Sequence, residues 1–238
     1  TLLTSLAVAS SSAFAADYTG GHADIGVALE GGTDFHLHFH AHENAVVDGV
    51  SLPADEEYDA DAVTIVVPDS VSQTLGTGIA ATGVGDGESI WILPQSNPNT
   101  DTIPFLGLGT EELSASDWGG ITFTLGAVTS PSGSGDFSLW QSDGVGGLDF
   151  YFSTVDASLT ENGNNTLIAV AGGHDHYSFG FSETGIWAVE LTVSGTHTTL
   201  GALSDTQTFE FNVVPEPSNA ALLLGLAAAG VMVRRRRV

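Results

Sequence analysis

The sequence predicts an all-β protein, folded as a single antiparallel two-sheet β-sandwich of the immunoglobulin-like or jelly-roll kind. Apolar and polar residues alternate in short runs along the chain, as expected of half-buried strands. Turn residues separate these runs, and 30 of the 238 residues are glycines. Between the two chain ends, no segment has a long apolar stripe with the period of a helix. The roughly 200 residues between the two chain ends are enough to bury one such core.

The expected strands are rich in Val, Ile, Thr and aromatic residues, which favour the pleated conformation. In chain order they cover residues 24–29, 35–41, 62–67, 89–93, 121–125, 136–140, 148–152, 166–170, 177–181, 185–193 and 206–213. A short helix is expected over residues 110–118, because Glu111 and Glu112 would stand in its first turn, where acidic side chains are favourable.

The charge of the chain is strongly one-sided, with 29 acidic and 4 basic residues and a formal net charge of −25. All the basic residues stand at the C-terminal end, as Arg234, Arg235, Arg236 and Arg237. The rest of the chain cannot neutralise a phosphate backbone, which argues against a nucleic-acid partner. The chain has no cysteine, which excludes disulfides and cysteine-based metal or redox sites.

Both ends of the chain have the composition of targeting segments. Ala13-Phe14-Ala15 follows an apolar stretch and fits the cleavage pattern of a secretory signal. We therefore expect residues 1–15 to be the remnant of a signal peptide and residues 16–213 to form the folded domain. At the other end, the apolar run 220–233 is shorter than the ~17–25 residues that span a bilayer comfortably. We expect a short C-terminal membrane helix there, ended by the arginines.

The C-terminal segment, residues 214–238, resembles the PEP-CTERM sorting signal of Gram-negative bacteria. The features that carry the resemblance are the motif Pro215, Glu216 and Pro217, the apolar run and the arginine cluster, in that order. The resemblance implies processing by an exosortase and transient anchoring in the inner membrane. The protein would then reach the cell surface or the extracellular matrix. A permanent C-terminal anchor is the alternative.

Histidines provide the candidate chemistry, and most of them occur in two groups. In the first group they alternate with apolar residues, so in a strand all of them would point to one face and the apolar residues to the core. This group comprises His36, His38, His40 and His42, and the second comprises His174 and His176. His22 and Asp24 form a third candidate pair.

Imidazole binds zinc, copper, nickel and iron readily. We therefore predict a site for Zn²⁺ or another divalent transition metal. Its ligands would be His38, His40, His174 and His176, with His22 or His36 in support. In the alternative interpretation, these side chains are solvated on a polar strand face and bind no ion.

Acidic residues are dense over residues 55–61, and this loop is a candidate for Ca²⁺. The segment does not match the ligand spacing of an EF-hand, so a solvated acidic loop is the favoured interpretation.

Six fragments resemble the bacterial choice-of-anchor M surface domain. They are residues 21–25, 90–95, 106–112, 137–140, 174–181 and 185–187. The family pattern has a Trp and a Tyr where this chain has Phe179 and Trp187, so two aromatic positions differ. The resemblance implies a surface domain attached through a variable anchor. Because relatives occur beside transporters of the metal-uptake type, it also implies metal or ligand capture.

The sequence thus favours an exported, non-enzymatic protein that binds a divalent transition metal. Two alternatives stay open. One is an acidic matrix or adhesion module that interacts with exopolysaccharide, other surface proteins and cations without a specific metal site. The other is a metal-dependent hydrolase. Trp91, Trp118, Trp140 and Trp187 could stack on sugars, but each lies in or beside an apolar run, so most of them are expected in the core.

Overall fold

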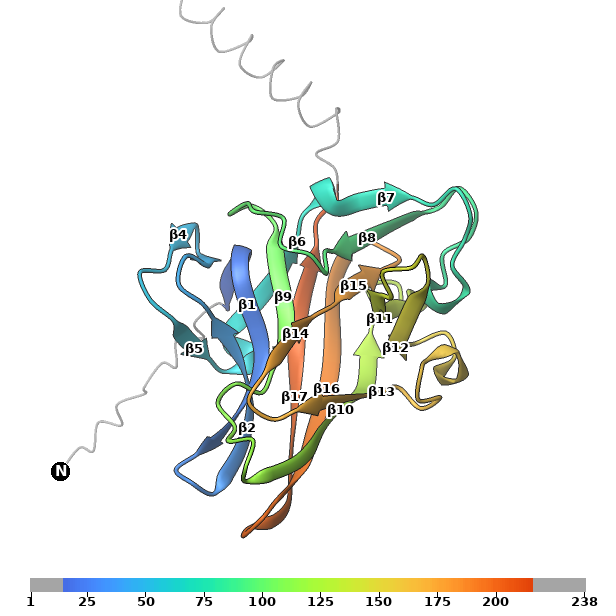
Figure 1. Ribbon diagram of the computed structural model, residues 1–238. Coiled ribbons are helices and arrows are strands. Elements are labelled where there is room, and N and C mark those ends of the chain that lie inside the picture. The colour runs from blue at the N-terminus through green and yellow to red at the C-terminus, as the bar shows by residue number, and fades with distance from the viewer. Residues whose placement is uncertain (1–14, 216–238) are drawn as a thin grey trace, which may run out of the picture.

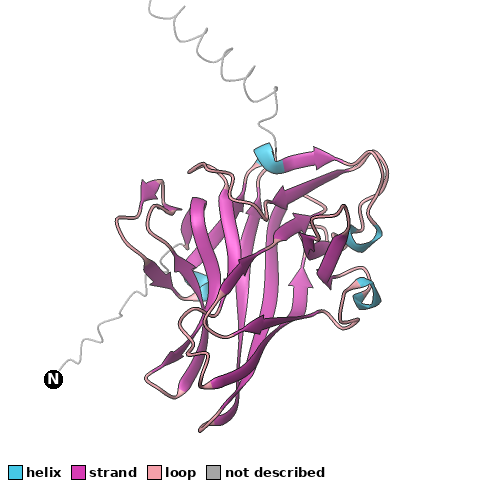
Figure 2. Ribbon diagram, in the orientation of Figure 1, coloured by secondary structure: helices cyan, strands magenta, loops and turns pink. Residues whose placement is uncertain are grey.

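A computed structural model describes residues 15–215 of the chain. All but the last residue of the expected signal segment lies outside these residues, as do most of the sorting motif, the apolar run and the arginines. The described part is mostly β and contains two sheets, so the predicted all-β class is confirmed (Figures 1 and 2). Its only helical elements are 3₁₀ turns at Ala60–Ala62, Asp69–Val71, Ala80–Thr82 and Ala157–Leu159. Between residues 15 and 215, no helix has the length and apolar character needed to cross a membrane.

The larger sheet contains twelve strands. Its main path runs through β13 (Thr166–Val170), β10 (Trp118–Thr129), β16 (Gly185–His197), β17 (Gly201–Val213), β6 (Val63–Val67), β1 (Ala16–Glu30), β2 (Asp34–Ala41) and β5 (Glu56–Tyr58). Beside β1 lie β9 (Pro104–Gly109), which pairs with β14 (His174–His176), and β3 (Val46–Val47), which pairs with β4 (Val50–Ser51). The smaller sheet is ordered β12 (Leu148–Ser153), β11 (Phe137–Ser142), β15 (Ser178–Phe181), β8 (Ser89–Leu93) and β7 (Ser72–Thr74).

The pairing is not purely antiparallel, which corrects that part of the prediction. β1 runs parallel to β6 and to β9, and β17 runs parallel to β6. β1 is long enough to have both parallel partners, because its first residues pair with β6 and the part after Gly20 pairs with β9. Parallel neighbours require long crossover connections, and local sequence patterns do not report them.

Aromatic side chains hold the two sheets together. The Phe181 ring on β15 lies 5.4 Å from the Trp187 ring on β16 and 5.1 Å from the Phe211 ring on β17. Phe179, on the same strand of the smaller sheet, lies 6.1 Å from Phe211. All four residues are buried. This aromatic layer therefore packs the smaller sheet against the larger one.

The hairpin of β1 and β2 buries one face and leaves the other for polar groups. Ile25 and Val27 of β1 are buried, as are Leu37 and Phe39 of β2. Because neighbouring residues in a strand point to opposite faces, the histidines of β2 lie on the other side of the sheet. The alternation along β2 therefore has the sense that the sequence predicts.

The prediction of a helix over residues 110–118 is wrong. Residues 110–117 form a loop with two tight turns, closed by the Leu113 N–H on the Thr110 carbonyl and the Asp117 N–H on the Ser114 carbonyl. Thr110 also exchanges backbone hydrogen bonds with Gly172 and Gly173, which ties the loop to the start of β14. This tie prevents the chain from continuing as a helix.

Candidate metal centre

Strand register places residues of four strands in rows on one face of the sheet. In one row, His176 of β14 faces Gly107 of β9, Gly107 faces Asp24 of β1, and Asp24 faces His40 of β2. In the next row, glycines of β9 and β1 stand between two further histidines, in the order His174, Gly109, Gly26 and His38. Histidines thus lie at both sides of the face, with glycines and Asp24 between them.

The glycines provide the space in which the side chains of this face meet. A Cβ atom on Gly107 would lie 2.0 Å from Oδ1 of Asp24 and 2.9 Å from the Asp175 carbonyl oxygen. A Cβ atom on Gly26 would lie 3.1 Å from Nε2 of His38. Larger residues at these two positions would therefore displace the polar side chains.

Asp24 is the buried centre of the face and is 1% exposed. Its Oδ2 lies 2.8 Å from Nε2 of His42 and 3.5 Å from Nε2 of His22. The His22 and His42 rings stack with centroids 4.0 Å apart, because His42 follows β2 and donates its N–H to the His22 carbonyl. The same His22 ring lies 4.8 Å from the ring of His176. A continuous row of rings therefore connects β2 to β14.

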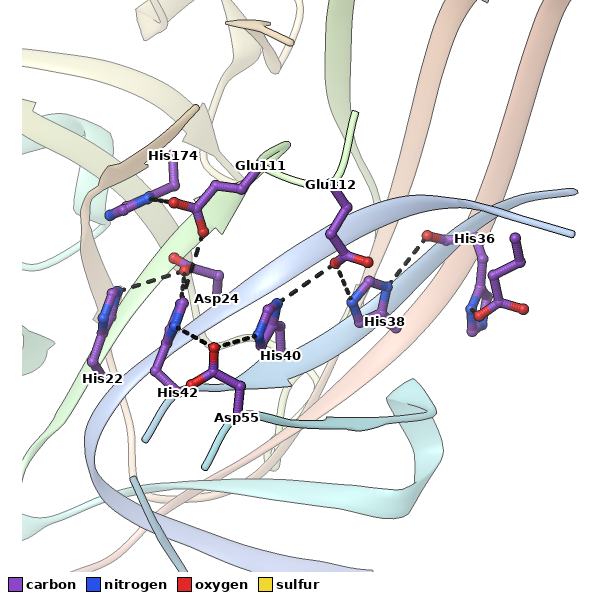
Figure 3. A network of polar contacts seen from close by, with 11 residues as sticks. His22, Asp24, His36, His38, His40, His42, Asp55, Glu111, Glu112 and His174 are labelled. Atoms are coloured by element: carbon purple, nitrogen blue, oxygen red, sulfur yellow. Dashed lines mark hydrogen bonds and ion pairs between the residues drawn. The ribbon is translucent and has the colours of Figure 1, made fainter. Parts of the chain in front are cut away.

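Three carboxylates approach the histidines from neighbouring loops (Figure 3). Oε1 of Glu112 lies 3.1 Å from Nε2 of His38 and 3.5 Å from Nδ1 of His40, and Glu111 contacts Nδ1 of His174. Asp55, just before β5, lies 3.8 Å from both His40 and His42. We call the complete set the histidine face, which consists of His22, Asp24, His38, His40, His42, Asp55, Glu111, Glu112, His174 and His176.

Five groups on the histidine face bring three ligand atoms within 4.8 Å of one another. They are His22–His174–His176, His22–Asp24–His42, Asp24–Glu111–His174, His40–His42–Asp55 and His38–His40–Glu112. None of them combines the β2 pair with the β14 pair, so the single four-histidine site that the sequence predicts is not formed. β9 and β1 lie between the two pairs, and three strand spacings amount to about 14 Å.

His36 stands apart from these groups, although the sequence places it among the supporting ligands. Its Nδ1 lies 2.7 Å from Glu30, and its Nε2 lies 3.7 Å from Asp59. Within residues 15–215 it belongs to none of the five groups.

The histidine face also contains four carboxylates and His42, which are not among the predicted ligands. His42 continues the alternation of β2, and Asp24 stands two residues from His22, so both had a signal in the sequence. Asp55, Glu111 and Glu112 come from loops, for which spacing gives no direction. The acidic loop at residues 55–61 therefore contributes to the histidine face, because Asp55 contacts two of its histidines.

Loss of hydration determines the pKa of two histidines near β14, His22 and His176. Burial lowers the pKa of His22 to about 4 and also lowers the pKa of His176, because the charged imidazolium loses its hydration. Burial would raise the pKa of Asp24, but the hydrogen bond from His42 and the nearby imidazoles outweigh it, and the pKa is lowered.

Glu112 dominates the electrostatics of the β2 end. Burial opposes the protonation of His38, but the nearby carboxylate of Glu112 prevails and raises the pKa of His38. The hydrogen bond with Glu112 is the main cause that raises the pKa of His40. The contacts from His38 and His40 lower the pKa of Glu112 to about 2.

Unpartnered polar atoms concentrate on this face. Among the described residues, five buried side-chain nitrogen or oxygen atoms have no hydrogen-bond partner. Four of them belong to the histidine face, namely Nε2 of His22, Oδ1 of Asp24, Nε2 of His38 and Nδ1 of His176. Each such atom costs about 1–3 kcal/mol when it stays unpaired. A bound cation would satisfy these lone pairs, so the donor set fits a transition metal.

Features elsewhere on the molecule offer less to a ligand. Trp118, Trp140 and Trp187 are buried, so the expectation that most tryptophans belong to the core is confirmed. Asp143 accepts the N–H groups of Val145 and Gly147 at 2.8 and 2.7 Å, which commits it to its own turn.

The fold and the face define an all-β protein with a candidate centre for divalent transition metals. No protein-family model, curated protein or solved structure matches the chain.

Proposed function

We propose that this protein binds a divalent transition metal ion, with zinc as the reference ion, without catalysing a reaction. The ion would be held by His22, His174 and His176. One observation carries the proposal. Three imidazole nitrogens from two separate strands lie within 4.8 Å of one another, and the buried Nε2 of His22 and Nδ1 of His176 have no hydrogen-bond partner.

The pKa values of two of the three rings, His22 and His176, favour a metal over a proton. A metal binds the neutral imidazole, and a pKa of about 4 keeps His22 neutral across the physiological range. The pKa of His176 is lowered in the same direction. Three imidazoles suit zinc, copper or nickel, and they leave a fourth position for water or a small ligand.

The proposed place of action is the cell surface or the extracellular matrix of a Gram-negative bacterium. The resemblances to the PEP-CTERM signal and to the choice-of-anchor M domain support export, with an exosortase as the processing partner. We also propose that the two sheets form a sandwich of the immunoglobulin-like or jelly-roll kind. In this setting the protein would capture metal ions outside the cell.

The test is a zinc titration of the 238-residue chain, purified in mild detergent without a polyhistidine tag and stripped of metal with a chelator. We expect micromolar or tighter binding that the His22→Ala/His174→Ala/His176→Ala variant weakens at least tenfold. His197→Ala is the matched control, because His197 packs on Trp118 away from the face. If zinc neither binds nor raises the melting temperature, the proposal fails and an acidic matrix module becomes the better hypothesis.

A further inference from the structure

A second cluster lies at the opposite side of the histidine face from the proposed site. We infer that His38, His40 and Glu112 bind a second metal ion, independently of the first, and that the face holds two ions at most. The inference deepens the proposed function and rests on it.

A backbone carbonyl of the same strand leaves Nε2 of His38 as the nitrogen that can bind a metal ion. Its side chain is 2% exposed, and its Nδ1 lies 3.5 Å from the His36 carbonyl oxygen. A proton on Nδ1 leaves a lone pair on Nε2. That Nε2 is buried and without a hydrogen-bond partner, and it lies 3.1 Å from Oε1 of Glu112. A lone pair and a carboxylate oxygen repel one another unless a cation stands between them.

His40 and Glu112 supply the other two ligands. His40 lies two residues after His38 on the same face of β2, and its Nδ1 lies 3.5 Å from the same Glu112 oxygen. The three ligand atoms lie within 4.8 Å of one another. Two imidazoles and one carboxylate form a common ligand set for zinc with an open position.

The overlap between groups limits the number of ions. Each of the other three groups shares a residue with either His22–His174–His176 or His38–His40–Glu112. In any choice of three of the five groups, at least two groups have a residue in common. At most two ions can therefore each have three ligands of their own.

Two of the groups share no residue with the first site, and each of them consists of two histidines and a carboxylate. They are His40–His42–Asp55 and His38–His40–Glu112. The group at Asp55 is the more open one, because the Asp55 side chain is 57% exposed and lies 3.8 Å from each of its histidines. The group at His38 is more buried and its contacts are shorter. Burial removes competing water and strengthens the attraction between ligand and ion. We therefore assign the second ion to His38, His40 and Glu112.

The experiment counts zinc ions on the tag-free full chain by native mass spectrometry, with metal content after dialysis as a second measurement. The wild type should bind two ions, and so should His197→Ala. His38→Ala/Glu112→Gln should bind one, and His22→Ala/His174→Ala/His176→Ala should bind the other. Replacing the buried His38 could disturb the fold, so Glu112→Gln alone serves as a second variant that keeps the fold. It should lower the affinity for one of the two zinc ions at least tenfold.

The outcomes separate this inference from the proposed function. One ion in the wild type, unaffected by Glu112→Gln or by His38→Ala/Glu112→Gln, overturns the second site and leaves the proposed function intact. No ion in the wild type overturns both. Three or more ions that resist dialysis would overturn the limit of two.

Discussion

Each ring of the histidine face must be neutral to bind a metal, and its surroundings determine how much that costs. His22 and His176 have lowered pKa values because they are buried. His38 and His40 have raised pKa values because Glu112 stabilises their protonated forms. Without metal, a proton can take the place of a cation at His38 and His40, whereas the lowered pKa values of His22 and His176 favour their neutral forms.

Acidification should therefore release the two ions in a fixed order. Protons compete for His38 and His40 as soon as the pH falls below their raised pKa values, and each ring costs up to about tenfold in affinity per pH unit. His22 does not take up a proton until the pH approaches 4. We expect the zinc ion at Glu112 to leave first as the pH is lowered from 7.5 to 5.5. Zinc counts at successive pH values measure this order.

The variant His38→Ala/Glu112→Gln is the control for this order, because its single ion should persist to the lower pH values. Release of both ions from the wild type at one common pH would contradict the prediction.

Asp24 should act on the metal through the rings that it contacts. It lies 2.8 Å from His42 and 3.5 Å from His22, and it is buried. Asp24→Asn keeps the shape but removes the charge that orients these imidazoles. We expect zinc affinity to fall about 10- to 100-fold, as for other groups behind metal ligands. Calorimetric titration measures the loss. Asp143→Asn removes the same charge from a distant exposed turn and should leave affinity unchanged, and equal losses in both variants would exclude a local role.

At the scale of elements, the predicted strands are all present because alternation and turn residues are local signals. β9 was missed for a physical reason. Its six residues are all buried, so its pattern does not alternate, and it contains Gly107 and Gly109, which have low strand propensity. The four-histidine site failed with it, since β9 is one of the two strands that separate the β2 and β14 pairs. The histidines of the face could be predicted as candidate ligands, but their grouping depends on long-range pairing.

The missing side chain of Gly107 should be essential to the face. An alanine Cβ there would meet Asp24 at 2.0 Å and the Asp175 backbone at 2.9 Å, so either side chains or β14 must move. We expect Gly107→Ala to lower the free energy of unfolding by about 1–3 kcal/mol. We also expect zinc affinity at His22, His174 and His176 to fall. Chemical denaturation and zinc titration measure the two effects.

Gly76→Ala is the matched control, because a Cβ atom at Gly76 meets no atom within 4 Å. Unchanged stability and zinc binding in Gly107→Ala would mean that the strands adjust freely, and that the glycine is not needed for the site.

At the scale of the whole molecule, the excess of acidic residues is the dominant electrostatic fact. The formal net charge is −25, and residues 15–215 contain neither Lys nor Arg. Every one of the ten ion pairs within that range has histidine as its cationic partner. Unprotonated histidines leave the carboxylates without compensation, and self-repulsion then disfavours the compact state. Dissolved cations and bound metal ions are what remains to offset it.

Salt and zinc should therefore stabilise the protein through separable effects. Raising NaCl from 10 to 150 mM shortens the screening length from about 30 to 8 Å, which weakens repulsion across the whole surface. A gain of about 1 kcal/mol corresponds to a rise of roughly 2–4 °C in melting temperature for a domain of this size. Zinc at 100 times its dissociation constant adds about 2.7 kcal/mol per site, and this increment saturates. Thermal denaturation at several salt and zinc concentrations measures both.

The salt effect should shrink near pH 4, where many carboxylates are neutral, because its source is their mutual repulsion. An equal rise at pH 4 and pH 7 would show that salt acts through apolar burial instead.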